Sequence, residues 1–410
     1  MNRLKLCAAL LVTFFIGAHV VNAQQKPIAL VASTILDGSG KVLHNQPIIV
    51  AGSKIVSIGG PIPAGAQVYN LGTLTITPGL IDTHAHIMWH FDQGRLAGKG
   101  EPPLQAMLHA VDNAIVTLDA GFTTIQSPGS PEDKYLRDAI VRGIIPGPRI
   151  LTSLQPLMAT SGDPVQLREL VRERKAQGAD FIKLFASKSI REGGEQTMSD
   201  AQLQAACGEA KKLGLRTLVH AHADSSARAA TMAGCTSIEH GAFVTDDVFR
   251  LMVKNGTYFD PNIGLVLQNY IANKEKYIGI GNYNDEGFAD MVKGEAIVLA
   301  GFKRALQIPG LQIVYGTDAV AGAHGRNGEE YIARIQQGGM QPMASLISAT
   351  SLSAKSLGLS DQIGTLAPGM QADIIAMDGN PLTDPTSVRR VEFVMKGGTI
   401  FKNDVPSHVK

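Results

Sequence analysis

From residue 78 onward, short apolar segments alternate with segments that have the spacing of amphipathic helices. This order favours parallel strands, because a crossover helix returns the chain to the same end of a sheet. Ser199 is the expected N-cap of one such helix and Gly214 its expected stop. Eight strand–helix units between residues 78 and 365 predict an α/β fold, a (β/α)8 TIM-type barrel. The predicted strands are "LIDTHAHI" (80–87), "FTTIQS" (122–127), "RILTSL" (149–154), "FIKLFAS" (181–187), "RTLVHAHA" (216–223), "SIEHG" (237–241), "TYFDPNI" (257–263) and "QIVYGTDA" (312–319).

Both flanks of this region hold short β-type runs that are broken by glycine and proline. Neither flank has enough strands to form a stable sheet alone. We therefore expect residues 24–77 and 366–410 to combine into one small β-sandwich domain beside the barrel of residues 78–365. The segment from about 264 to 300 is long for a connection in such a barrel, and a helical lid over the barrel mouth would explain its length.

Residues 1–23 have the layout of a cleavable secretory signal peptide. Arg3 and Lys5 precede an apolar run, and small residues precede the expected cleavage site after Ala23. A single membrane anchor is the alternative, but the apolar run is short for a span and contains His19. The sequence therefore predicts a periplasmic or secreted protein with no stable membrane span after cleavage.

Composition adds limits on the partners and on the cysteines. The net charge of the 410 residues is +1, which gives no reason to expect binding to nucleic acid. Small molecules or peptides are the expected substrates, and the sequence is compatible with a homo-oligomer. Export would permit a disulfide, but two cysteines make no disulfide framework, and we interpret Cys207 and Cys235 as small buried residues.

Polar side chains stand at the ends of five of the eight predicted strands. In a (β/α)8 barrel the chemistry takes place at the carboxyl ends of the strands. His84 and His86 are two residues apart, so both project to one face of a strand and can share a metal ion. Each residue also has an ordinary structural explanation, but unrelated structural roles would not gather them all on one rim. The candidates are His84, His86, Lys183, His220, His222, His240 and Asp318.

These motifs, with "PGLIDTHAHI" at one end and "IGTLAPGMQADIIAMDGNP" at the other, resemble the metal-dependent amidohydrolase superfamily over about residues 28–404. The chain looks most similar to the imidazolonepropionase-like branch, which includes Xaa-Pro dipeptidase-like and ochratoxinase-like enzymes. The resemblance implies hydrolysis of a carbon–nitrogen bond with two divalent metal ions, for which zinc is expected. It also assigns the metal ligands: His84, His86, Lys183, His220, His240 and Asp318.

The resemblance further implies a role for each catalytic side chain. N6-carboxylated Lys183 would bridge the two metals; a neutral amine reacts with carbon dioxide, and an apolar strand favours the neutral form. Asp318 would act as general acid and base for a metal-activated hydroxide. His222 would stabilise the oxyanion. His324 and Arg326, in the loop after the eighth strand, are candidate substrate-binding residues.

Some residues depart from the pattern or stay outside it. The loop after Lys183 lacks the tyrosine that holds the substrate carbonyl in many carboxypeptidase-like relatives, and the third strand lacks their Gly-His-rich ending. We interpret His90 as a solvated loop residue and His109 as a structural helix residue.

The sequence thus predicts an exported dinuclear amidohydrolase that acts on dipeptides or N-acyl amino acids. One alternative is a mononuclear deaminase or cyclic-amide hydrolase, against which Lys183 argues. A catalytically silent barrel used for binding is another alternative, against which the complete set of ligands argues.

Overall fold

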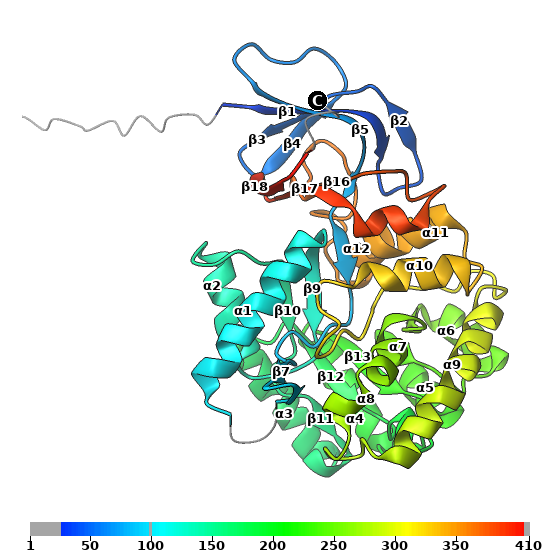
Figure 1. The fold of residues 1–410 in the computed structure, drawn as a ribbon. Helices are drawn as coiled ribbons and strands as arrows, with labels where there is room; N and C mark the ends of the chain where they lie inside the picture. The colour runs from blue at the N-terminus through cyan, green and yellow to red at the C-terminus, as the bar shows by residue number, and fades with distance from the viewer. Residues whose placement is uncertain (1–25, 98–100, 406–410) are drawn as a thin grey trace, which may run out of the picture.

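The computed structural model describes residues 26–97 and 101–405, which form a helix-covered body with a β-layer above it (Figure 1). The predicted signal peptide lies outside the described residues. Among the residues that are described, no helix combines the length and apolar character needed to cross a bilayer.

Strands from both ends of the chain build one eight-stranded sheet. Its order is β18-β17-β16-β5-β1-β3-β4, and β2 pairs with β1. β5 joins the two ends, because it pairs in parallel with β1 and antiparallel with β16. The β-layer that we expected as a small sandwich is therefore one continuous hydrogen-bonded sheet with strands from both ends of the chain. Its strands are β1 (Ile28–Leu36), β2 (Val42–His44), β3 (Ile48–Ala51), β4 (Lys54–Ile58), β5 (Gln67–Pro78), β16 (Ile374–Met377), β17 (Val391–Lys396) and β18 (Thr399–Asn403).

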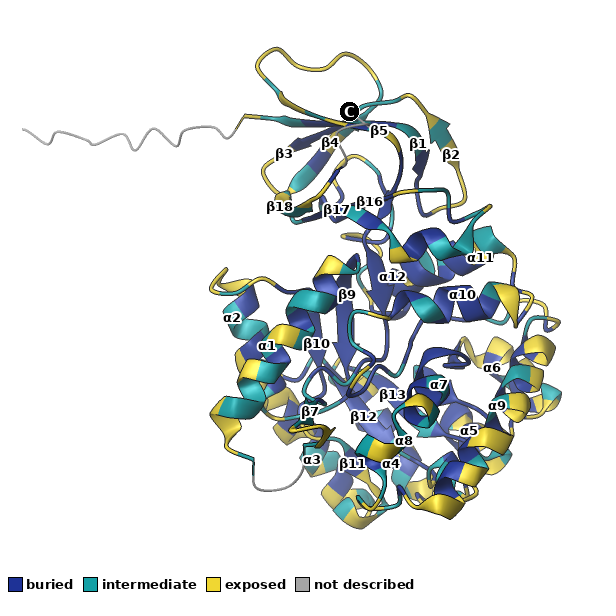
Figure 2. Cartoon of the chain, in the orientation of Figure 1, coloured by how far each residue is buried: buried dark blue, intermediate teal, exposed yellow. Residues whose placement is uncertain are grey.

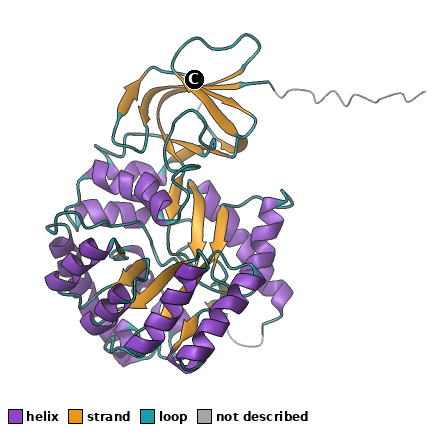
Figure 3. Cartoon of the chain, turned by 180° about the vertical axis from the view of Figure 1, so that it is seen from behind, coloured by secondary structure: helices purple, strands orange, loops and turns teal. Residues whose placement is uncertain are grey.

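The barrel strands run in parallel at the centre of the body, with helices around them (Figure 3). Seven of the eight predicted strands are regular. Two of the sheets meet where the Asp180 amide donates to the Thr152 carbonyl at 2.8 Å. The regular strands are β6 (Leu80–Asp82), β9 (Phe122–Ser127), β10 (Arg149–Thr152), β12 (Phe181–Phe185), β13 (Arg216–Ala221), β14 (Ser237–His240) and β15 (Tyr258–Asp260).

The eighth predicted strand, residues 312–319, is not a regular strand. It lies between β15 and β6 and is held by single bridges, Phe259 with Ile313 and Ala85 with Ala319. The Asp318 amide also donates to the His84 carbonyl at 2.7 Å. This irregular segment completes the ring of eight and places Asp318 beside the first strand.

The helices bury one side against the barrel and expose the other (Figure 2). Ser199 is the N-cap of α4, as predicted, and accepts a hydrogen bond from the Gln202 amide at 3.2 Å. The helices are α1 (Pro103–Asp119), α2 (Asp133–Val141), α3 (Pro164–Gln177), α4 (Asp200–Lys212), α5 (Asp224–Met232), α6 (Asp246–Asn255), α7 (Leu265–Ala272), α8 (Lys274–Tyr277), α9 (Asp285–Ala305), α10 (Gly328–Gln336), α11 (Pro342–Ile347) and α12 (Ser353–Ser356). The short strands β7 (Phe91–Asp92) and β8 (Arg95–Leu96) pair with each other, and β11 (Leu157–Met158) pairs in parallel with β12.

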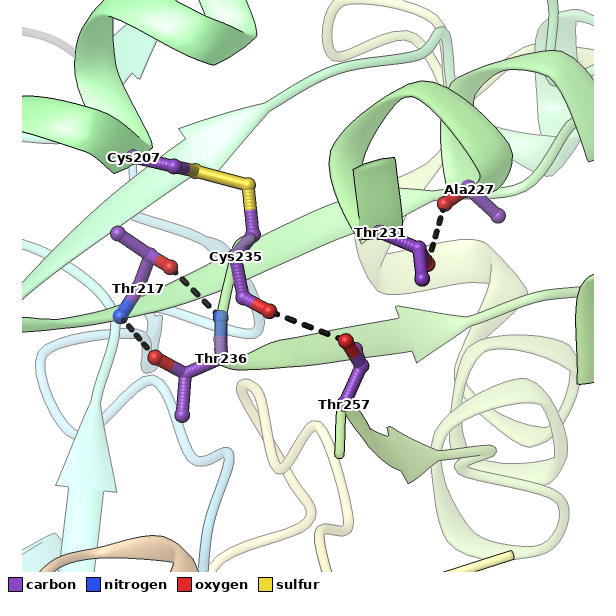
Figure 4. The surroundings of a disulfide bond; sticks show 7 residues. All are labelled: Cys207, Thr217, Ala227, Thr231, Cys235, Thr236 and Thr257. Atoms are coloured by element: carbon purple, nitrogen blue, oxygen red, sulfur yellow. Dashed lines mark hydrogen bonds between the residues drawn. A yellow bond between two sulfur atoms is a disulfide. The ribbon is translucent and has the colours of Figure 1, made fainter. Parts of the chain in front are cut away.

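The two cysteines form a disulfide bond (Figure 4). Cys207 on α4 and Cys235 before β14 have Cα atoms 5.2 Å apart, and both side chains are buried. Our interpretation of these cysteines as small buried residues without a bond was wrong. Their separation of 28 residues along the chain gave no sign of the pairing, because α4 and β14 become neighbours only after β13 has paired with β14.

Candidate active site

A cavity of about 440 Å³ opens at the carboxyl ends of the barrel strands. One wall consists of residues at the ends of β6, β12, β13 and β14 and in the irregular eighth segment. The opposite wall comes from the loop after β12 and from the segment that contains α7 and α9. All seven of the predicted strand-end residues line this cavity: His84, His86, Lys183, His220, His222, His240 and Asp318.

His84, His86 and Asp318 form the first group of candidate ligands. The two Nε2 atoms are 3.4 Å apart, and each lies 3.2 Å from Asp318 Oδ1. A tetrahedral zinc ion with bonds of about 2.0–2.1 Å holds its ligand atoms roughly 3.3 Å from one another. The three atoms therefore already have the spacing that one divalent ion requires.

His220, His222 and His240 form the second group, and a ring nitrogen from each lies within 4.8 Å of the others. Burial lowers the pKa of His220 and His240 well below the ordinary value and that of His222 to about 3. All three imidazoles are thus neutral near pH 7, the form in which histidine binds a metal.

Two ligand candidates have unusual backbone geometry. His240 has a φ of 67° and Asp318 a φ of 52°, in the left-handed region that residues other than glycine rarely adopt. Strain of this kind is concentrated at functional sites, where the surrounding structure must hold it. Here it places a side chain from the sixth strand and one from the eighth segment at the same cavity.

Lys183 lines the same cavity as both groups of ligands. Its side chain is fully buried. Its positive charge contributes to lowering the pKa of ligand candidates in both groups: Asp318, His86, His220 and His240. Its Nζ atom contacts the carboxylate of Glu239. Lys183 and Glu239 are therefore buried together beside the ligand groups.

Glu239 is a site residue that the sequence analysis missed. It is fully buried, and besides Lys183 it approaches Nδ1 of His84, at 2.9 Å. A carboxylate at Nδ1 favours the tautomer with the proton on that atom, so that Nε2 is free for a metal. The available signal was a glutamate directly before a ligand histidine in a short apolar strand, "SIEHG".

The opposite wall carries a cation and two tyrosines that the sequence analysis also missed. The Arg191 guanidinium lies over the ring of Tyr283 at 4.2 Å and over that of Tyr270 at 5.4 Å. Its Nε donates to Asn282 Oδ1 at 3.0 Å. Among the described residues no carboxylate forms an ion pair with Arg191, so its charge is available to a ligand in the cavity.

The structure places His324 and Arg326 away from this cavity. Both line a separate cavity of about 480 Å³ beside the end of α1 and the start of α10. The Nε2 of His324 lies 3.1 Å from the Trp89 carbonyl oxygen. The predicted substrate contacts of His324 and Arg326 therefore gain no support from their positions.

A (β/α)8 barrel with two groups of ligating side chains at one cavity has the architecture of the metal-dependent barrel hydrolases. The model of the Amidohydrolase family matches residues 75–401. The chain belongs to the amidohydrolase family, and it is a hydrolase of carbon–nitrogen bonds.

Three relatives confirm the predicted branch. Ochratoxinase from Aspergillus niger is 23% identical over 443 residues, which cover 93% of this chain and 90% of that protein. Imidazolonepropionase from Yersinia pseudotuberculosis is 24% identical over 284 residues, 55% of this chain and 65% of that protein. A crystal structure of a Xaa-Pro dipeptidase with bound methionine in the active site superposes with a TM-score of 0.83 at 28% identity, and covers 92% of this chain and 100% of that one.

Proposed function

We propose that this protein is an exported dinuclear amide hydrolase whose substrates are dipeptides or N-acyl amino acids with a free carboxylate. The observation that carries the proposal is the pair of ligand groups in one cavity that the buried Lys183 also lines. A single-metal enzyme has no use for a second complete group of ligands or for a buried amine at that position.

The ligand atoms of His84, His86 and Asp318 have the spacing that one divalent ion requires. The histidines of the second group are neutral and can bind another ion. We propose that both ions are zinc. His84, His86 and Asp318 would hold one ion, His220 and His240 the other, and N6-carboxylated Lys183 both. Such ions lower the pKa of a bound water and polarise an amide carbonyl.

Two side chains are available for the proton and charge transfers of amide hydrolysis. Asp318 accepts the proton of the attacking water and delivers it to the leaving nitrogen. His222 is neutral, and its Nδ1 atom is buried with no hydrogen-bond partner among the described residues. It can therefore donate a hydrogen bond to the oxygen that gains negative charge in the transition state.

The opposite wall supports a substrate with one apolar part and one carboxylate. Val266, Leu267 and Ile190 line the cavity and suit an apolar side chain. Arg191 supplies a planar cation for which a carboxylate is the natural partner. In a relative, a Xaa-Pro dipeptidase, the active site holds methionine, a ligand with an apolar side chain and a carboxylate.

The proposal of export rests on residues 1–23 and on the disulfide. Bonds such as Cys207–Cys235 form and persist in oxidising compartments. A periplasmic or secreted location after cleavage at Ala23 is consistent with both features.

The test is turnover by the zinc-loaded mature protein of two matched sets of substrates. One set contains dipeptides and N-acyl amino acids with apolar side chains, and the other contains the same compounds as carboxamides. We expect kcat/KM to be about 100-fold higher for the acids, because a charged hydrogen-bonded pair is lost with the amides. Turnover of lactams or exocyclic amines alone would instead support the mononuclear alternative.

The number of metals requires its own measurement. We expect Lys183→Ala to contain fewer zinc equivalents than the wild type and to lose activity. The exposed lysine variant Lys212→Ala is the matched control. Full zinc content and normal turnover in Lys183→Ala would contradict the bridging role.

A further inference from the structure

A third group of metal-ligating side chains lies outside the catalytic cavity. His90, Glu101 and His109 each offer one ligand atom, and these atoms lie within 4.8 Å of one another. His90 and Glu101 line a second cavity of about 310 Å³, which also includes Trp89. The sequence interpretation, which treated His90 and His109 as unconnected, did not bring these residues together.

The surroundings of His90 define which of its nitrogens carries a proton. Its Nδ1 lies 2.8 Å from the Met88 carbonyl oxygen, which can only accept, so the proton of a neutral ring is on Nδ1. Its Nε2 then presents a lone pair, yet it lies 3.0 Å from both oxygens of Glu101. Either His90 is protonated or a cation lies between the two acceptors. A ring with one N–H on a backbone carbonyl and the other nitrogen on a metal is the usual arrangement of ligating histidines.

His109 is the third member of the group. Its ring stacks on that of His90 with centroids 4.2 Å apart and an angle of 13° between the planes. One ligand atom of His109 lies within 4.8 Å of those of His90 and Glu101, and a second carboxylate, Asp92, has Oδ1 4.0 Å from His109 Nε2. Because the lone pair of an imidazole lies in the plane of its ring, binding of one ion by both histidines requires the two rings to turn out of this stack. Two imidazole nitrogens with carboxylate oxygen are a ligand set that zinc accepts.

We propose that His90, Glu101 and His109 bind a further divalent cation of the zinc class, with a structural role. The site joins the loop that contains β7 and β8 to helix α1. That loop begins beside Trp89, which lines both cavities and whose ring lies 5.2 Å from that of His86. A cation at this site holds the Trp89 side of the catalytic wall without contact with the substrate.

The location of the metal is tested by X-ray diffraction at the zinc absorption edge, on crystals of the full mature protein equilibrated with zinc chloride. The inference predicts an anomalous peak between His90 Nε2 and the Glu101 carboxylate, in addition to any peak in the catalytic cavity. A map with peaks in the catalytic cavity alone overturns it and leaves the proposed function intact.

Metal content tests the same inference in solution. After dialysis against micromolar zinc chloride, His109→Gln should hold one equivalent less than the wild type, and so should Glu101→Gln. His109 is partly exposed on a helix, so its replacement preserves the fold, and His44→Gln on the exposed β2 is the matched control. Equal zinc content in the wild type and His109→Gln would show that His90 and Glu101 form an ion pair only.

Trp89 provides a second readout, because it is the single tryptophan of the chain. When zinc is titrated into the metal-free wild type, its fluorescence should change in one phase more than the ions of the catalytic cavity produce alone. His109→Gln should lack this additional phase. The same number of phases in the wild type and in His109→Gln would contradict the inference.

Discussion

The two walls of the catalytic cavity differ in how their side chains are held. On the metal wall, Lys183 and His240 belong to strands whose ladders fix their positions. On the opposite wall, Arg191 lies within a short 3-10 turn, Ile190–Glu192, and Tyr283 lies between α8 and α9. The reaction chemistry thus uses side chains on the barrel strands or directly after them, and substrate recognition uses connections that can change without loss of the barrel.

The largest effect should come from the metal wall. Asp318→Asn keeps the size of the side chain and one oxygen, but it cannot accept a proton. We expect kcat to fall about 10³-fold for acid and amide substrates alike, because general acid–base catalysis contributes about 10²- to 10⁴-fold. Steady-state kinetics of zinc-loaded protein measures this loss. A loss confined to KM would place Asp318 in binding rather than in catalysis.

On the opposite wall, Arg191→Gln should change specificity instead. We expect kcat/KM to fall about 30- to 100-fold for N-acyl amino acids and to change little for their carboxamides, because only the acids lose a charged hydrogen bond. Arg191→Lys should recover part of the difference. Equal losses on both substrates would mean that Arg191 only supports the loop through Asn282.

Glu239→Gln tests whether the metal wall depends on buried supports as well as on ligands. Loss of the carboxylate at His84 Nδ1 should weaken zinc binding roughly tenfold, as is typical of residues that orient a ligand. Competition with a chelator measures the affinity, and the exposed Glu195→Gln serves as control. Unchanged affinity would remove Glu239 from the metal site.

The smallest effect should come from Tyr283→Phe. The Tyr283 hydroxyl is buried and has no hydrogen-bond partner among the described residues, so it is free to bind the substrate where the expected loop tyrosine is missing. We expect kcat/KM to fall about threefold to tenfold, the cost of one neutral hydrogen bond. A variant with unaltered kinetics would leave only the ring of Tyr283 as part of the site.

The same contrast decides how much could be predicted from the sequence. His84 and His86 could be placed together because the spacing of residues on a strand fixes the face to which they project. Arg191 and Tyr283 carry no such spacing, and their approach depends on how residues 264–300 fold back over the barrel. From the sequence, Glu239 could be predicted only to be a buried residue of β14. Its contacts could not be predicted, because its partners His84 and Lys183 come from two other strands.

The pairing of β5 with both β1 and β16 has a consequence for the order of folding. Ile76 lies opposite Ala376, so the sheet cannot be completed until almost the whole chain has been synthesised. Contacts so distant in sequence form slowly, because a large loop must close before they stabilise anything. Truncation near the C-terminus should therefore leave β5 with an unpaired edge, and chains that stop before β16 are expected to aggregate rather than to fold as a shorter barrel.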